Sequence, residues 1–76
     1  MIEELASVVL TTSMPEHGLQ AGDIGTVVLV HQEGKGYTVE FMTLSGETVA
    51  VVTVGAEHVR PIRHNEIAHV RELIAA

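Results

Sequence analysis

The fold is decided by residues 24–54, IGTVVLVHQEGKGYTVEFMTLSGETVAVVTV. This stretch holds three runs rich in β-branched and aromatic residues, 24–31, 37–42 and 48–54, and these residue types favour strands. The runs are separated by EGKG and LSGE, which are glycine-containing turn signals that favour tight hairpins. We therefore expect three consecutive antiparallel strands that pair as a meander.

The third strand shows a clear alternation of apolar and polar residues. Tyr37, Val39 and Phe41 alternate with Thr38 and Glu40. Because successive side chains of a strand point to opposite faces, the face that carries the two aromatic residues is expected to lie in the core.

Shorter elements flank the meander. Residues 5–13, LASVVLTTS, predict a first strand that ends before the first proline. Residues 14–23, MPEHGLQAGD, predict a long loop, because their Pro and Gly residues supply bends. Residues 55–59 predict a single helical turn, and residues 59–62 a last strand that Pro61 confines to the edge of the sheet.

The hydrophobic period changes from residue 65 onward. Four apolar residues fall on one helical stripe: Ile67, Val70, Leu73 and Ile74. We expect a C-terminal helix over residues 64–75, with Asn65 or His64 as its N-cap. A helix of about ten residues is unstable alone in water, so this one is expected to dock on the sheet or on another chain.

Taken in order, these elements describe a single domain over residues 1–76. Five short strands, a long loop after the first, two tight hairpins and a helical turn before the last are typical of a small SH3-like β-barrel, here residues 5–62. The predicted fold class is all-β, with a short C-terminal α-helix added. An OB-type barrel is the main competitor, but it usually carries a helix between the third and fourth strands, where only LSGE stands.

Composition limits how so small a chain is stabilised. Of 76 residues, 46% are hydrophobic, 18% are charged and none is Cys. Disulfides are excluded, and small domains without them usually depend on metal or association. The apolar excess predicts that some surface is buried between copies, in a homodimer or a higher oligomer.

Charge narrows the class of partner. The formal net charge is −6 and only four residues are Lys or Arg. Nucleic-acid binding is not expected, because neutralisation of phosphates supplies most of its affinity, whereas a basic protein partner suits an acidic chain.

Glu3 and Glu4 stand where a signal peptide needs positive charge, and no apolar run approaches the roughly 20 residues of a membrane span. We expect a cytoplasmic protein without a membrane partner.

The second and fourth strands are apolar on both faces. In the second strand Ile24, Val28 and Val30 are assigned to the core, which leaves Val27 and Leu29 on the other face. If the outward face of these strands were exposed to solvent, its apolar area would be large enough to mark an interaction site. We therefore expect the C-terminal helix or a second subunit to pack on it. The candidate interface combines strand and helix positions: Val27, Leu29, Ala50, Val52, Val54, Ile67, Val70, Leu73 and Ile74.

The start of the second strand, GDIG, receives a structural role. It contains two glycines but lacks the Lys and Ser or Thr of a phosphate loop, and it opens a strand rather than a helix. Gly22 is assigned to the turn, Asp23 to an Asx-type bond with nearby backbone, and Gly25 to a bulge or a close backbone approach.

Three residues are candidates for contact with a ligand: His17, His31 and Tyr37. His17 has Glu16 beside it and Asp23 at the far end of the loop, a combination that general acid–base catalysis uses. No nucleophile or oxyanion-binding group accompanies it, so a structural role in the loop is preferred and no catalytic residue is predicted.

The other histidines do not have metal-ligand spacing. His58, His64 and His69 are six and five residues apart, whereas two ligands on one helix face are three or four apart. The sequence predicts no metal site and no cofactor.

The core of the chain, about residues 7–62, carries the pattern PEHGL, GDIGTVV, YTVEF. In these residues it resembles a family of small bacterial proteins described only as a domain of unknown function, and its glycine-led second strand is similar to KOW-type SH3-like barrels. The resemblance implies a five-stranded SH3-like fold without established enzyme activity, and the small partner of a two-gene toxin–antitoxin or immunity arrangement. KOW-type barrels that bind RNA are typically basic, and this chain departs from them.

The function expected from the sequence is that of a non-enzymatic protein-interaction module, an antitoxin or immunity partner of a neighbouring gene product. One alternative is an oligomeric small-molecule-binding protein or enzyme with its site between subunits. Another is an RNA-binding KOW-like module.

Overall fold

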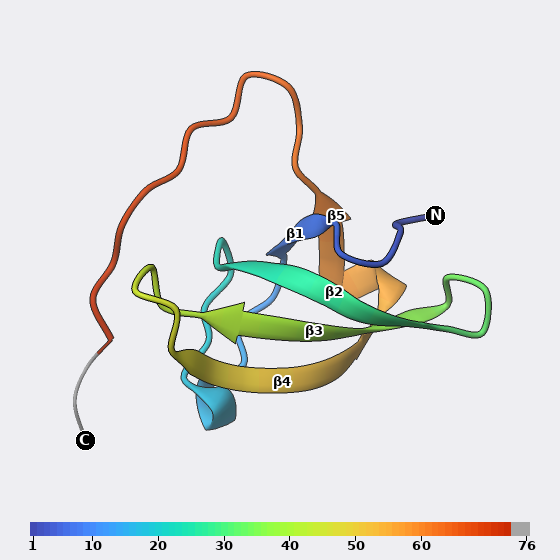
Figure 1. Ribbon diagram of the computed structural model, residues 1–76, viewed down its shortest axis with the longest axis horizontal. Coiled ribbons are helices and arrows are strands. Elements are labelled where there is room, and N and C mark those ends of the chain that lie inside the picture. The colour runs from blue at the N-terminus through green and yellow to red at the C-terminus, as the bar shows by residue number, and fades with distance from the viewer. Residues whose placement is uncertain (74–76) are drawn as a thin grey trace.

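The chain forms one five-stranded antiparallel sheet in a computed structural model that describes residues 1–73 (Figure 1). The strand order is β4-β3-β2-β1-β5. The strands are β1 (Ser7–Leu10), β2 (Ile24–His31), β3 (Gly36–Met42), β4 (Thr48–Gly55) and β5 (Val59–Pro61). Two turns of 3₁₀ helix, η1 (Pro15–His17) and η2 (Ala56–His58), precede β2 and β5.

The meander predicted from residues 24–54 is confirmed. β2 spans the predicted residues, and β3 and β4 each extend one residue beyond the prediction. β1 is shorter than predicted, because the chain leaves the sheet after Leu10 to enter the long loop. β5 pairs only with β1, with Pro61 opposite Val8, and is an edge strand as predicted.

A single core lies on the inward side of the sheet. Tyr37, Val39 and Phe41 are almost completely buried there, which confirms the face predicted for the third strand. Leu19 reaches this core from the loop after β1. The buried cluster consists of Val8, Leu10, Leu19, Val27, Tyr37, Val39, Phe41, Val52, Val54 and Val59.

A bulge in β2 decides which side chains face this core. Val27 pairs with Val39 and Leu29 pairs with Thr38, so Val28 is an extra residue that has no partner in β3. A bulge of this kind shifts the alternation of faces by one residue. As a result Val27 is fully buried, whereas Leu29 is 51% exposed.

The faces assigned to β2 from the sequence are therefore partly wrong. Val27, predicted to face outward, lies in the core, and Ile24, predicted to face inward, is 46% exposed. Val30 packs against the core as predicted, because it lies beyond the bulge. Strict alternation places either Val27 or Val30 correctly, but not both.

β4 also corrects the predicted interface. Val52 and Val54 are buried in the core and Ala50 packs against it, so these three residues do not form an outward surface. The other face carries Val51, which is 54% exposed, and Thr53. Only one of the two apolar faces of β4 is thus left to solvent, and it is not the face that carries the predicted interface residues.

The predicted C-terminal helix is wrong for the residues that the structure describes. From Ile62 to Leu73 the chain contains no helix: it turns at His64 and Asn65, where the φ of Asn65 is 70° rather than that of an N-cap, and then continues without regular structure. All of these residues are exposed except Arg71, which is half-buried. An extended chain reaches about 3.3 Å per residue against 1.5 Å for a helix, and this reach brings Arg71 to the loop before β2. Ile74 and the last residues of the predicted helix lie outside the described range.

Gly25 is expected to be intolerant of any side chain. A Cβ at this position would lie 2.5 Å from Cγ1 of Val39 and 2.9 Å from Cε1 of Phe41, both in the core. We predict that Gly25→Ala lowers the free energy of unfolding by about 1–3 kcal/mol, the usual cost of overpacking. Urea denaturation measures this, with the outward-facing Thr26→Ala as the control. An unchanged midpoint for Gly25→Ala would contradict the close packing of β2 on β3.

Candidate functional site

The loop between β1 and β2 is an ordered platform. Met14 and Leu19 form an isolated antiparallel bridge around η1, and Leu19 is 2% exposed, so the loop is anchored in the core. The N–H of Gly22 donates to the carbonyl of Leu10 at 2.7 Å, and the φ of Gly22 is 99°, a left-handed value that favours glycine. These contacts fix the position of Asp23 at the start of β2.

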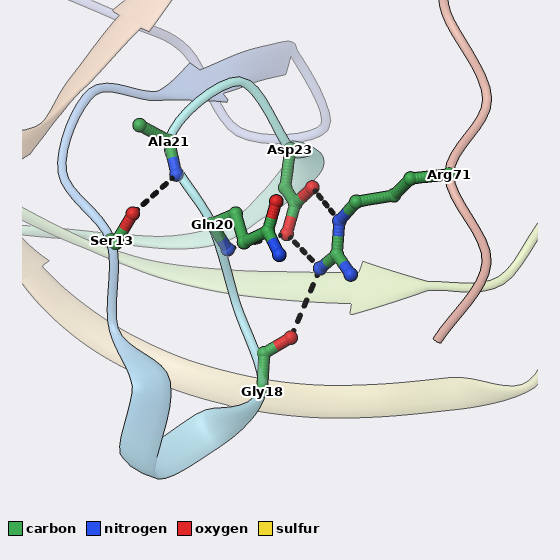
Figure 2. A network of polar contacts seen from close by, with 6 residues as sticks. All are labelled: Ser13, Gly18, Gln20, Ala21, Asp23 and Arg71. Carbon is green, nitrogen blue, oxygen red and sulfur yellow. Dashed lines mark hydrogen bonds and ion pairs between the residues drawn. The ribbon is translucent and has the colours of Figure 1, made fainter. Parts of the chain in front are cut away.

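Asp23 is the centre of a polar network that joins this loop to the C-terminal segment (Figure 2). Its Oδ2 accepts a hydrogen bond from the backbone N–H of Gln20 at 2.8 Å. This is a bond to nearby backbone, but it reaches a residue three positions before Asp23, whereas the Asx-type bond predicted from the sequence runs to a residue two positions after it. Arg71 donates from Nε to Oδ1 at 2.8 Å and from Nη2 to Oδ2 at 2.6 Å. Nη2 of Arg71 also donates to the carbonyl of Gly18 at 3.0 Å. We call these contacts of Arg71 the clasp.

The clasp has a clear electrostatic consequence. The hydrogen bonds from Arg71 hold the pKa of Asp23 below its ordinary value, although partial burial acts in the opposite direction. Bidentate pairing of a guanidinium with a carboxylate is among the stronger polar contacts in proteins. The side chains are only 17% (Asp23) and 30% (Arg71) exposed, so water screens this pair less than an ordinary surface ion pair.

Residues 62–73 form the segment that the clasp holds, which we call the arm. Near its start, Glu66 accepts two hydrogen bonds from the guanidinium of Arg60, at 2.9 and 2.7 Å, and one from the N–H of Arg63. These contacts, led by that with Arg60, lower the pKa of Glu66 to about 2. Between this ion pair and the clasp, Ile67 is 94% exposed and Val70 is 66% exposed.

A second surface lies on the outward side of β2, β3 and β4. Nε2 of His31 and Oγ1 of Thr38 are 2.6 Å apart, and the hydroxyls of Thr38 and Thr53 are 2.8 Å apart, which makes a polar row across the three strands. Leu29 and Val51 are exposed on the same side. We call this the outer sheet face.

The three ligand candidates from the sequence do not form one site. His31 lies on the outer sheet face, in the polar row. Tyr37 points into the core, where its hydroxyl accepts a hydrogen bond from the N–H of Ile2 at 3.2 Å. His17 ends η1 in the loop and is exposed. Within residues 1–73, no three His, Asp or Glu side chains gather as metal ligands would.

Most carboxylates of the protein lie outside the two ion pairs formed with Arg60 and Arg71. Of ten carboxylate side chains, Asp23 and Glu66 pair with Arg71 and Arg60, which are two of the four basic residues. Over the described part of the chain, the other carboxylates have no Lys or Arg partner within ion-pair distance. No helix among the described residues is long and apolar enough to cross a membrane.

Sequence reasoning missed the clasp. It recognised Asp23 as a turn residue but predicted a helix for the segment that contains Arg71, and the two residues are 48 positions apart. Nothing in the spacing of a single sequence pairs two charges at that separation. The signal available in the sequence was the small number of basic residues. Because the chain has only four Lys and Arg for ten carboxylates, each Arg is a preferred partner for a carboxylate that is partly buried.

These observations define a small all-β domain with an ordered loop, a clasped arm and an exposed outer sheet face. Comparison with family models places residues 4–61 in the family described as Domain of unknown function (DUF4926), and the chain belongs to that family. The match covers the sheet and the loop but ends before the arm. No match was found among curated proteins, nor among solved structures.

Acid is expected to release the arm. The carboxyl groups of Asp23 and Glu66 have lowered pKa values, so their ion pairs are complete above the ordinary values of 3.8 and 4.5 and are lost as the pH falls through the lowered ones. We predict that the carboxyl carbon of Glu66 titrates by NMR with a midpoint near 2. In Arg60→Ala, which removes the main cause, the midpoint should rise toward 4.5. The same midpoint in both proteins would contradict the pairing.

Proposed function

We propose that this protein is a non-enzymatic protein-interaction module that binds a basic partner protein through the outer sheet face and the open edge of β4. The order of five short strands, with a 3₁₀ turn before the last, supports an SH3-like barrel as the scaffold. The observation that carries the proposal is that β4 is a long, uncharged edge strand beside exposed apolar side chains.

The edge of β4 is suited to pairing with another strand. β4 runs for eight residues, TVAVVTVG, without charge or proline, and it is the last strand of the sheet on its side. The N–H of Ala56 donates to the carbonyl of Lys35, and the alternation of an antiparallel ladder then directs the backbone groups of Val51 and Thr53 to the open edge. Such an edge is a ready template for an added strand.

Charge indicates the chemistry of the partner. Glu47 precedes β4, Glu57 follows it in η2, and Glu40 lies on the neighbouring strand beside Val51. A second copy of β4 paired antiparallel would bring Glu47 of one chain toward Glu57 of the other, which disfavours self-pairing along this edge. An extended segment with an uncharged centre and Lys or Arg at its ends meets all three carboxylates favourably.

The partner is proposed to be the product of a neighbouring gene, with this protein as its antitoxin or immunity partner. The acidic surface and the open edge of β4 support this assignment, because both suit a basic effector protein. Coexpression with the neighbouring gene product should give a complex that survives purification, or should relieve toxicity. A harmless neighbour that never copurifies would contradict this assignment.

A variant of β4 tests the binding surface itself. We predict that Val51→Lys weakens the complex at least tenfold, since it places a charge that repels a basic partner on the outer sheet face beside the edge. Leu44→Lys is the matched control: Leu44 is 91% exposed in the turn between β3 and β4, and its replacement should leave affinity within about twofold. Isothermal titration calorimetry measures both. Equal affinities for the two variants would exclude β4 as the binding surface.

A further inference from the structure

Two ion pairs attach the arm to the rest of the molecule. Near its start Glu66 pairs with Arg60, and near its end Arg71 enters the clasp. None of the described arm residues belongs to the core cluster or packs against it. In Figure 1 the arm leaves the end of β5, bows away from the sheet and returns toward the opposite side of the molecule.

The site that receives Arg71 is built by the loop alone. Asp23 is already oriented by the N–H of Gln20, and the hydroxyl of Ser13 accepts from the N–H of Ala21 at 3.1 Å (Figure 2). The carbonyl of Gly18, the third acceptor, follows η1 in the same loop. Any chain that presents the same arm can therefore occupy this site, including the arm of a second copy.

The arm is long enough to reach a second copy. Arg71 lies ten positions after Pro61, the end of β5, and a fully extended chain over ten positions spans up to roughly 35 Å. The longest dimension of the whole molecule is 36 Å. The span is therefore sufficient to carry Arg71 to an adjacent molecule.

Within one chain the arm leaves apolar side chains in water. Ile67 and Val70 are 94 and 66% exposed, whereas Leu73, which is 45% exposed, lines a groove with Pro15 and Leu19 of the loop. If two chains exchange arms about a two-fold axis, the two spans run past each other between the bodies, and the side chains of Ile67 and Val70 acquire apolar neighbours. The exchange keeps every hydrogen bond of the clasp and changes only the path of the span, which makes it a low-cost route to a dimer.

We propose that two copies exchange their arms, so that Arg71 of each chain binds Asp23 and the Gly18 carbonyl of the other. The occupant of the loop site is then a second copy of this chain, and the site is completed by a residue of the partner copy. This proposal uses the loop and the arm, and it stands independently of the β4 surface.

Charge reversal distinguishes exchange from attachment within one chain. Asp23→Arg and Arg71→Asp each place two like charges in the clasp, so each variant alone should be monomeric by sedimentation equilibrium at concentrations where the wild type has twice the mass of one chain. Mixed together, the two variants form complementary clasps only between chains. The mixture should therefore recover the dimer, at least tenfold more stable than either variant alone. The double variant Asp23→Arg/Arg71→Asp should also be dimeric.

Two results would overturn the proposal. The first is that the wild-type protein stays monomeric even at concentrations 100-fold above the low-micromolar range. The second is that a mixture of correctly folded variants stays monomeric. Circular dichroism checks that each variant keeps its sheet. If Asp23→Arg does not fold, a mixture of isotope-labelled and unlabelled wild-type chains gives the answer. Isotope-filtered NMR should then show contacts between Arg71 and Gly18 of different chains, and contacts within one chain only would refute the exchange.

Discussion

The bulge at Val28 is the constraint on which the rest of the structure depends. β2 is the central strand of the five and pairs with both β1 and β3, so the side chains that it turns inward determine what the core contains. On one side of the bulge Gly25 and Val27 face inward, and on the other side Val30 does. The bulge thus separates Gly25, which lies close to Val39 and Phe41, from Leu29, which is exposed.

The bulge also explains how the outer sheet face arises. Once Val27 is inside, the outward positions of the three long strands are a mixture: His31, Thr38 and Thr53 share hydrogen bonds, and Leu29 and Val51 remain exposed. This face therefore combines hydrogen-bonded polar side chains with a few exposed apolar ones. The loop platform and the arm form a second, separate set of contacts, centred on Asp23.

Much of the fold was predictable from the sequence, because residues 24–54 combine strand-forming residues with unambiguous turns, and Tyr37, Val39 and Phe41 alternate regularly. The face of β2 was not predictable, since a run such as TVVLV contains no signal for a bulge that shifts its alternation. The helix predicted for the arm is wrong for a different reason. Ile67, Val70 and Leu73 have helical spacing, but the pull of Arg71 toward Asp23 requires an extended chain, and this tertiary contact prevails over a local preference that is weak in so short a segment.

The central claim is that a rigid sheet carries an arm that is held by two ion pairs, Arg60–Glu66 and Arg71–Asp23, rather than by packing in the core. Amide hydrogen exchange on the wild-type protein at neutral pH tests it most directly. The account predicts strong protection in the paired residues of β2 and β3, protection of the Gln20 amide that donates to Asp23, and rapid exchange at the arm amides between Glu66 and Arg71. Protection at consecutive amides from Ile67 to Leu73, as in a docked helix, would contradict it.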